Sequence, residues 1–365
     1  MANVEVVAYN VAVFISNLFL LEFGADKFID HTAIVARRTG ISETLIGLLT
    51  AGGEWEELVV VVASLAQGRS SLAIGNIVGS AISNILGAFS LGLLFYEKGQ
   101  SIEFDGSSRV YSIILLVVTT FVTPVTYFSN RTVWLAGGVI LLTFFIIYIA
   151  SIGVAISRGT LTAPEDSDDD SSDDDTSTAD STIDEAERSP LIQARTGMLY
   201  DGSARPEPPD EHEQSMIMPA AEPGHRRKVR RSLGYHIFYL ILGFLAICLA
   251  GYVLSHAATT ITDELGISDV LFGVIVLAIA TTLPEKFVAV LSGHRGHTGI
   301  LVANTAGSNV FLLALCAGIV MLDTSGKVDG GNVSVAELGV LWGSTLAFTL
   351  TVWFGARFAL GSLSA

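Results

Sequence analysis

The chain has 365 residues, half of them hydrophobic, and a mean hydropathy of +0.57. Its net charge of −16 comes largely from residues 165–187, which hold twelve Asp and Glu. The rest of the chain is close to neutral, so the composition gives no support for nucleic-acid binding. A soluble domain can be this apolar on average, but it does not contain many runs of about 20 apolar residues, the length that spans a bilayer.

Nine apolar runs of roughly this length follow one another along the chain. Only helices and closed barrels satisfy the backbone in lipid, and these runs are too long and continuous for barrel strands. The sequence therefore predicts an all-α polytopic bundle of about nine transmembrane helices. The runs lie at residues 4–24, 44–66, 72–95, 110–129, 133–157, 234–256, 269–292, 299–322 and 335–359. The two cysteines, Cys248 and Cys316, each lie inside a run and are interpreted as small hydrophobic residues.

Residues 158–233 separate the first five runs (1–157) from the last four (234–365). This segment is rich in Asp, Ser, Thr, Pro and Glu and cannot bury enough apolar surface to fold, so we predict an acidic disordered loop. It ends at residues 225–231 with five basic residues beside a predicted membrane helix, which favours the cytosolic side.

A cytosolic loop fixes the sidedness of all nine predicted spans. It places the N-terminus outside the cytosol and most basic residues inside. Of the 20 Lys and Arg, only Arg69, Arg131 and Lys327 fall on the outer side, and Lys286 lies within a span. This asymmetry supports the predicted topology.

An internal repeat relates the two halves. Residues 40–47 (GISETLIG) resemble residues 266–273 (GISDVLFG), and Ser and an acid stand where each helix would begin. Glu57 and Glu285 are each followed 22 residues later by Gly-Ser, and Asn76 and Asn304 match at the same offset of 228. In the predicted topology the second and seventh spans cross in opposite directions. This indicates inverted-topology repeats, an architecture of many secondary transporters. Duplication within an inert scaffold is less favoured, because the matching residues are polar.

Four acidic residues fall within predicted spans, although each charge costs roughly 2.5–3.5 kcal/mol there. They are Glu54, Glu56 and Glu57 in the second span and Glu285 in the seventh. Helical spacing places Glu54 and Glu57 on one face and directs Glu56 elsewhere. The alternative is that the second span begins later and these acids are interfacial.

Both groups of acids follow helix-weakening residues, Gly52-Gly53 and Pro284. Weakened helices direct backbone carbonyls and half-helix ends towards a central cavity. Six to eight oxygen ligands suit Ca²⁺, and two carboxylates neutralise its charge. The supporting oxygens would come from Thr50, Thr281, Thr282, Ser80 and Ser308.

Two further residues have two interpretations each. Asn84 is a candidate ligand or a packing residue. Lys286 is either a tethered cation beside Glu285 or a side chain that snorkels to the cytosolic edge, and snorkelling is favoured. The small residues at Gly75 and Gly79 are interpreted as a helix-packing motif.

At these residues the chain resembles the Ca²⁺/cation antiporter superfamily, most closely the sodium/calcium exchanger-like membrane region. The resemblance covers residues 24–90 and 262–320. It rests on Gly-Ile-Ser…Gly, on AIATTLPE at 278–285, and on Gly-Asn-x-x-Gly-Ser with its counterpart Asn304-x-x-Gly-Ser-Asn. It implies Glu57 and Glu285 as main ion ligands. Thr281, Thr282, Ser80, Ser308 and Asn84 would be secondary ligands.

The first repeat departs from the family pattern. Gly-Glu-Trp-Glu-Glu at 53–57 replaces a Thr-Ser-x-Pro-Glu element, which removes two hydroxyls and adds the acid Glu54. Leu312 stands where the family usually carries Asn or Asp, and Ser83-Asn84 resembles the proton-coupled branch more than the sodium-coupled one.

The resulting hypothesis is an antiporter that exchanges Ca²⁺ for Na⁺ or H⁺ by alternating access and needs no resident cofactor. A passive cation channel and a transport-inactive regulatory relative are the alternatives. An intramembrane enzyme is disfavoured, because the close pair His294 and His297 lies in a short predicted cytosolic turn rather than in a span.

Overall fold

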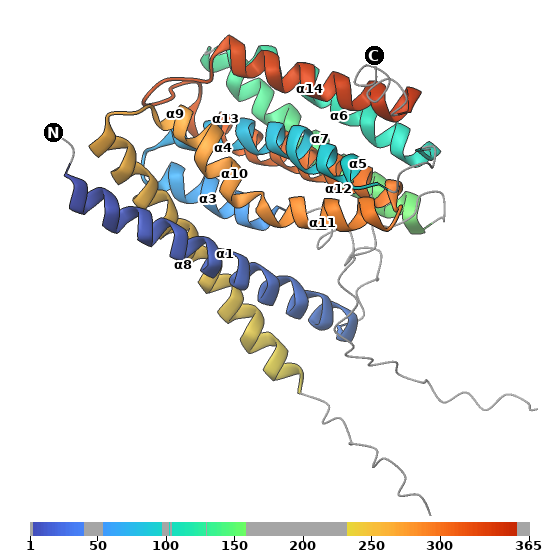
Figure 1. The fold of residues 1–365 in the computed structure, drawn as a ribbon, viewed down its shortest axis with the longest axis horizontal. Helices are drawn as coiled ribbons and strands as arrows, with labels where there is room; N and C mark the ends of the chain where they lie inside the picture. The colour runs from blue at the N-terminus through green and yellow to red at the C-terminus, as the bar shows by residue number, and fades with distance from the viewer. Residues whose placement is uncertain are drawn as a thin grey trace, which may run out of the picture. The chain divides into compact units, whose positions relative to one another are not determined.

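The fold is a bundle of helices (Figure 1). The computed structural model describes residues 3–39, 54–96, 102, 104–128, 130–157 and 232–355. Every regular element within these ranges is a helix. The predicted loop at 158–233 and the first copy of the GIS motif at 40–47 lie outside the described residues, apart from residues 232 and 233.

The first half contains one long helix, two short helices around a tight turn, and two further long helices. They are α1 (Val4–Arg38), α3 (Trp55–Ala66), α4 (Ser70–Ile82), the π-helix η1 (Ser83–Phe89), α5 (Ser90–Leu94), α6 (Gly106–Tyr127) and α7 (Arg131–Ser157).

The second half repeats this order without a counterpart of α7. Its elements are α8 (Leu233–Leu265), α9 (Asp269–Phe272), the π-helix η2 (Gly273–Leu277), α10 (Ala278–Thr281), α11 (Leu283–His294), α12 (Thr298–Val310), the π-helix η3 (Phe311–Cys316), α13 (Ala317–Thr324) and α14 (Val335–Phe354).

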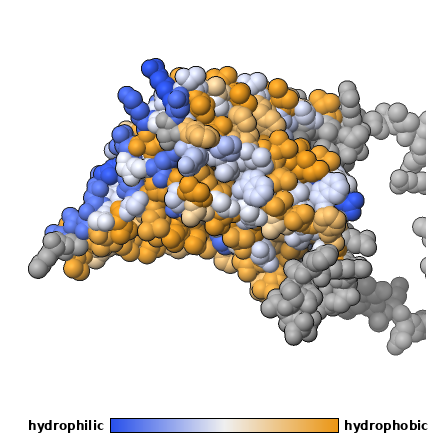
Figure 2. Space-filling model, turned by 90° about the horizontal axis from the view of Figure 1, so that it is seen from above, coloured by the Kyte–Doolittle hydropathy of each residue, from blue (hydrophilic) through white to orange (hydrophobic). Residues whose placement is uncertain are grey.

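Seven helices in the described ranges are long and apolar enough to cross a membrane, and an eighth segment is a bent pair. The predicted all-helical membrane bundle is therefore confirmed. The predicted count of nine stays a prediction, because the run at 44–66 is described only from Glu54 onward. Two helices exceed their predicted runs, since α1 continues from residue 24 to Arg38 and α8 continues from residue 256 to Leu265. Many large hydrophobic side chains are exposed, as a lipid-facing surface requires. Figure 2 shows hydrophobic residues over much of one face of the molecule.

The internal repeat extends to the helix boundaries. Adding 228 to the ends of α3 gives the ends of α11, and the same shift converts α4 into α12 and the start of η1 into the start of η3. The turns between the short helices also match, because Gly68 and Gly296 both have positive φ, 69° and 76°. The two halves thus share one local structure as well as a sequence pattern.

Corresponding helices that touch run antiparallel. In the α1–α8 pair, Asn3 donates to Glu264 near one end, and His31 contacts His236 near the other. In the α6–α14 pair, Thr349 donates to the Ser112 carbonyl, whereas Asn332 donates to that of Thr126. Figure 1 shows α1 beside α8 and α6 beside α14. This is the packing that two inverted repeats would produce.

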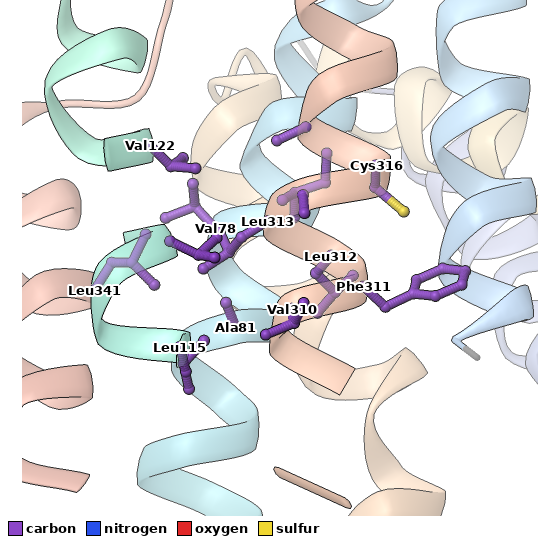
Figure 3. Packing of buried hydrophobic residues seen from close by; sticks show 14 of the residues in the cluster. Val78, Ala81, Leu115, Val122, Val310, Phe311, Leu312, Leu313, Cys316 and Leu341 are labelled. Atoms are coloured by element: carbon purple, nitrogen blue, oxygen red, sulfur yellow. The ribbon is translucent and has the colours of Figure 1, made fainter. Parts of the chain in front are cut away.

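The central core is built by the paired short helices and their π-helical continuations. Residues of α4, η3, α6 and α14 meet there, among them Val78, Leu312, Leu115 and Leu341 (Figure 3). Both cysteines are free, and Cys316 is buried in this core, which agrees with their interpretation as hydrophobic residues.

Close approach of α4 to the α9–η2 segment depends on Gly75 and Gly79. A Cβ on Gly75 would lie 2.7 Å from the Val270 carbonyl oxygen, and one on Gly79 would lie 2.7 Å from the Cβ of Ala278 and closer still to Val274. Both partners at the nearest contacts are backbone atoms, which cannot move aside independently. The predicted packing role of this pair is confirmed.

We expect the substitution Gly79→Ala to destabilise the protein by about 1–3 kcal/mol, because the added methyl overpacks this contact. Gly339→Ala in α14 is the matched control, since nothing lies within 4 Å of its Cβ position. The midpoints of thermal unfolding in detergent test this difference. Equal midpoints for the two variants would contradict it.

Candidate functional site

A helix break places Glu285 inside the bundle. The segment Asp269–Thr281 and α11 meet at a bend of 50°. Thr282 has non-helical dihedrals (φ −92°, ψ 20°), and Pro284, one of the first residues of α11, lacks the N–H that would continue the hydrogen-bond ladder. The predicted weakening before Glu285 is confirmed, and Glu285 lies in the first turn of the new helix.

Glu57 is fully buried in the first turn of α3. Asn76 of α4 donates to one of its carboxylate oxygens at 2.6 Å, and Ser80, one helical turn further, donates to the other at 3.0 Å. Thr281, from the opposite repeat, lies near the same carboxylate, and its hydroxyl donates to the Leu277 carbonyl at 2.9 Å. Two charge-assisted hydrogen bonds from one helix therefore fix the position of this side chain.

Glu54 connects the two repeats. It immediately precedes α3, is 4% exposed, and lies close to Glu285, Ser308 and Asn84. Two carboxyl groups this close are stable only when a proton or a cation lies between them. The carboxyl group beside Glu285 is thus that of Glu54, three residues before Glu57.

Several oxygens at this place have no hydrogen-bond partner. Among the described residues, the buried unpartnered oxygens include Glu54 Oε1, Glu285 Oε2, Asn76 Oδ1 and Asn84 Oδ1. A buried acceptor without a donor costs about 1–3 kcal/mol, and more when it is charged. Four acceptors on neighbouring side chains indicate a position for a positively charged, oxygen-binding ligand.

The described carboxylates do not converge on one point. Within the described ranges, no three His, Cys, Asp or Glu side chains converge in the manner of a metal site. Glu57 with its donors and the Glu54–Glu285 pair are therefore two adjacent parts of one polar region.

Lys286 points into the bundle rather than to its edge. Its Nζ donates to the Ser83 hydroxyl at 2.9 Å, to the Thr282 carbonyl at 2.9 Å and to the Thr282 hydroxyl at 2.6 Å. The side chain thus extends back towards the helix break, away from the end of α11 predicted to be cytosolic. The favoured interpretation, snorkelling, is wrong. The break at Thr282 leaves a carbonyl and a hydroxyl that accept from the Lys286 ammonium, so the side chain does not extend to the membrane edge.

A second polar cluster lies at the opposite end of α4. Arg69 binds Asp263 at 2.5 Å and Asp269 at 3.3 Å. Asp269 also accepts from Thr262 and Ser71. The hydrogen bond to Asp263 raises the pKa of Arg69. Ser268 occupies the predicted N-cap position without a side-chain capping bond, and Asp269 links three helices instead.

All eight predicted site residues lie in this region, but they are grouped differently from the expectation. Glu57 is grouped with Ser80 and Thr281, and Glu54 with Glu285, Ser308 and Asn84. The Thr282 hydroxyl accepts a hydrogen bond from Lys286. Thr50 lies outside the described residues. Leu312 is fully buried in the hydrophobic core.

Sequence reasoning missed three polar partners, Asn76, Ser83 and Asn309. The sequence indicates Asn76 only as a repeat match, although its amide donates the shorter of the two hydrogen bonds to Glu57. Asn309 accepts from Asn84 at 3.4 Å and donates to the Ala81 carbonyl at 3.2 Å. The Gly-Ser-Asn sequence at 307–309 was a signal for Asn309, and the proximity of Ser83 could not be read from spacing.

The profile of the sodium/calcium exchanger protein family matches residues 9–153 and 235–364. The chain belongs to this family. It is accordingly a multi-pass membrane protein and a transporter rather than an enzyme, and the resemblance identified from the motifs is confirmed.

Relatives and solved structures agree with this assignment. The sodium/calcium exchanger MaX1 of Methanosarcina acetivorans is 24% identical over 86% of this chain and 83% of its own length. The inner membrane protein YrbG of Escherichia coli is 25% identical over 94% of this chain and 88% of its own. The fold is also similar to that of the sodium-calcium exchanger NCX_Mj, with a TM-score of 0.51 and 21% identity over 95% of this chain and 91% of that one.

We expect Asn76→Ala to destabilise the protein by about 1–3 kcal/mol, because it leaves a fully buried carboxylate without its closest donor. Asn304→Ala is the matched control, since it removes the same amide at the corresponding position of α12, where the residue is only partly buried. Thermal unfolding of both variants measures the difference. An equal loss in both would contradict a specific role for the Asn76–Glu57 bond.

Proposed function

We propose that the protein exchanges Ca²⁺ for Na⁺ or H⁺ by alternating access, with the ion bound among Glu57, Glu285 and Glu54. The observation that carries this proposal is the set of buried, unpartnered oxygens contributed by both repeats. Oxygen ligands without His or Cys suit a hard divalent cation. Names of relatives such as MaX1 support calcium and sodium as the cargo.

The secondary ligands would be Ser80, Asn84, Thr281, Thr282 and Ser308. We infer that binding of Ca²⁺ draws Glu57 and the Glu54–Glu285 pair together, because the divalent charge offsets their mutual repulsion. A monovalent cation or protons would then release Ca²⁺ by neutralising the same carboxylates. Competition for one set of ligands couples the two fluxes.

Antiparallel packing of corresponding helices supports alternating access. A site between inverted repeats faces two similar half-structures, and exchanging their conformations opens it to the opposite side. In the proposed orientation the N-terminus is outside the cytosol and the segment 158–233 is a cytosolic loop between two transmembrane repeats, 1–157 and 234–365.

The first test replaces the central acids. Glu57→Gln and Glu285→Gln should each reduce uptake of radioactive calcium into reconstituted vesicles by about 100-fold or more, because losing one buried charge partner costs about 3–5 kcal/mol. Glu5→Gln, at an exposed position of α1, should leave uptake unchanged. Normal uptake by both site variants would refute the proposed site. Absence of transport in the unmodified protein would favour the transport-inactive relative.

The second test imposes Na⁺, K⁺ and H⁺ gradients one at a time on vesicles that contain the protein. We expect calcium accumulation against its own gradient with Na⁺ or H⁺, because exchange couples the fluxes through shared ligands. Calcium equilibration that ignores every counter-ion gradient would indicate the channel alternative instead.

A further inference from the structure

Three charged residues near the helix break have no charged counterpart in the internal repeat. The offset of 228 relates Glu57 to Glu285, but it relates Glu54 to Thr282, Glu56 to Pro284 and Lys286 to Leu58. One repeat therefore has two additional carboxylates, and the other has an additional ammonium group. Each is costly in a membrane by itself, so their presence together requires a physical reason.

The ammonium group is fully coordinated by protein oxygens. A lysine Nζ has three hydrogen-bond donors, and all three are used, at 2.9, 2.9 and 2.6 Å. The Ser83 and Thr282 hydroxyls lie 2.9 Å from each other and come from opposite repeats. Two hydroxyls and one carbonyl at a helix break are oxygen ligands of the kind that a monovalent metal cation would use.

The side-chain stem is also accommodated. A Cβ on Gly87 would lie 3.0 Å from the Lys286 Cε, so the glycine in η1 leaves room for the stem. Gly87 of the first repeat thus makes room for the stem, and the ammonium binds both repeats, at Ser83 of the first and at Thr282 of the second.

Charge balance links Lys286 to the acids of this region. The acidic groups that act electrostatically on Lys286 are Glu285, Glu57 and Glu54. Glu56 in turn acts electrostatically on Glu285. The ammonium group of Lys286 therefore offsets part of the repulsion among these carboxylates.

We propose that Lys286 is a built-in monovalent cation, which occupies the oxygen-lined position between Ser83 and Thr282 that a mobile counter-ion would otherwise fill. This assignment rests on the proposed exchange function. A tethered charge cannot leave the site, so the protein would couple one monovalent cation fewer to each Ca²⁺ than the same site without the lysine.

The test is the variant Lys286→Met, which retains much of the stem and removes the charge. The midpoint of thermal unfolding in calcium-free detergent is measured against the concentration of Na⁺, and separately of K⁺. Each additional bound cation steepens the dependence of stability on the logarithm of concentration. We expect the slope for one of these ions to correspond to about one more bound cation in Lys286→Met than in the unmodified protein.

Lys27→Met is the matched control, because this lysine is partly exposed and lies 3.6 Å from Asp30 on the same helix. Its slope should equal that of the unmodified protein. Equal slopes for Lys286→Met and the unmodified protein, with both ions, would overturn the proposal. If Lys286→Met does not fold, Lys286→Gln, which also removes the charge, is held to the same criterion.

A flux measurement provides the second readout. With a counter-ion gradient of about tenfold, one additional coupled ion changes the calcium ratio at zero net flux by about tenfold. We expect this shift in Lys286→Met but not in Lys27→Met, and an unchanged ratio would count against the proposal. The unfolding measurement needs no transport, so absence of calcium flux in the unmodified protein would refute the exchange function and not this cation position.

Discussion

The cost of holding carboxylates away from water constrains the rest of the structure. Glu54 and Glu57 are almost completely buried, and Glu285 approaches Glu54 from the opposite repeat. Such groups persist only where donors, cations or protons compensate for lost hydration. Asn76 and Ser80 supply donors to Glu57, and Lys286 supplies a cation. The tight glycine contacts of α4 and the break at Thr282 are what bring these groups within reach. Fold and site thus serve the same electrostatic requirement.

Much of this was predictable because membranes simplify the relation between sequence and structure. Runs of apolar residues gave the helices, and the offset of 228 gave the correspondence between α3 and α11 and between α4 and α12. Ionisable residues are rare in such runs and mark candidate sites, and together with the repeated motifs they indicate the eight candidate site residues. The helix weakening at Pro284 followed from the missing proline N–H.

The remaining details depend on three-dimensional contacts that spacing does not encode. Whether Glu285 touches Glu54 or Glu57 depends on where α3 begins, and Glu54 precedes its first turn. The direction of Lys286 depends on the carbonyl and hydroxyl that the break at Thr282 leaves available. The lengths of α1 and α8 exceed their apolar runs because each continues along the other, as contacts from Asn3–Glu264 to His31–His236 indicate.

The pairing of α6 with α14 has a consequence for biosynthesis. Hydroxyl groups of α6, such as Thr119 and Thr120, contact Thr345 and Trp342, which are translated more than 200 residues later. At about 5–20 residues per second, the ribosome needs on the order of 10–40 s to reach them. During that interval the polar groups of α6 are in the membrane without their partners on α14. Correct assembly therefore depends on how the insertion machinery protects the incomplete chain, as well as on the stability of the completed bundle.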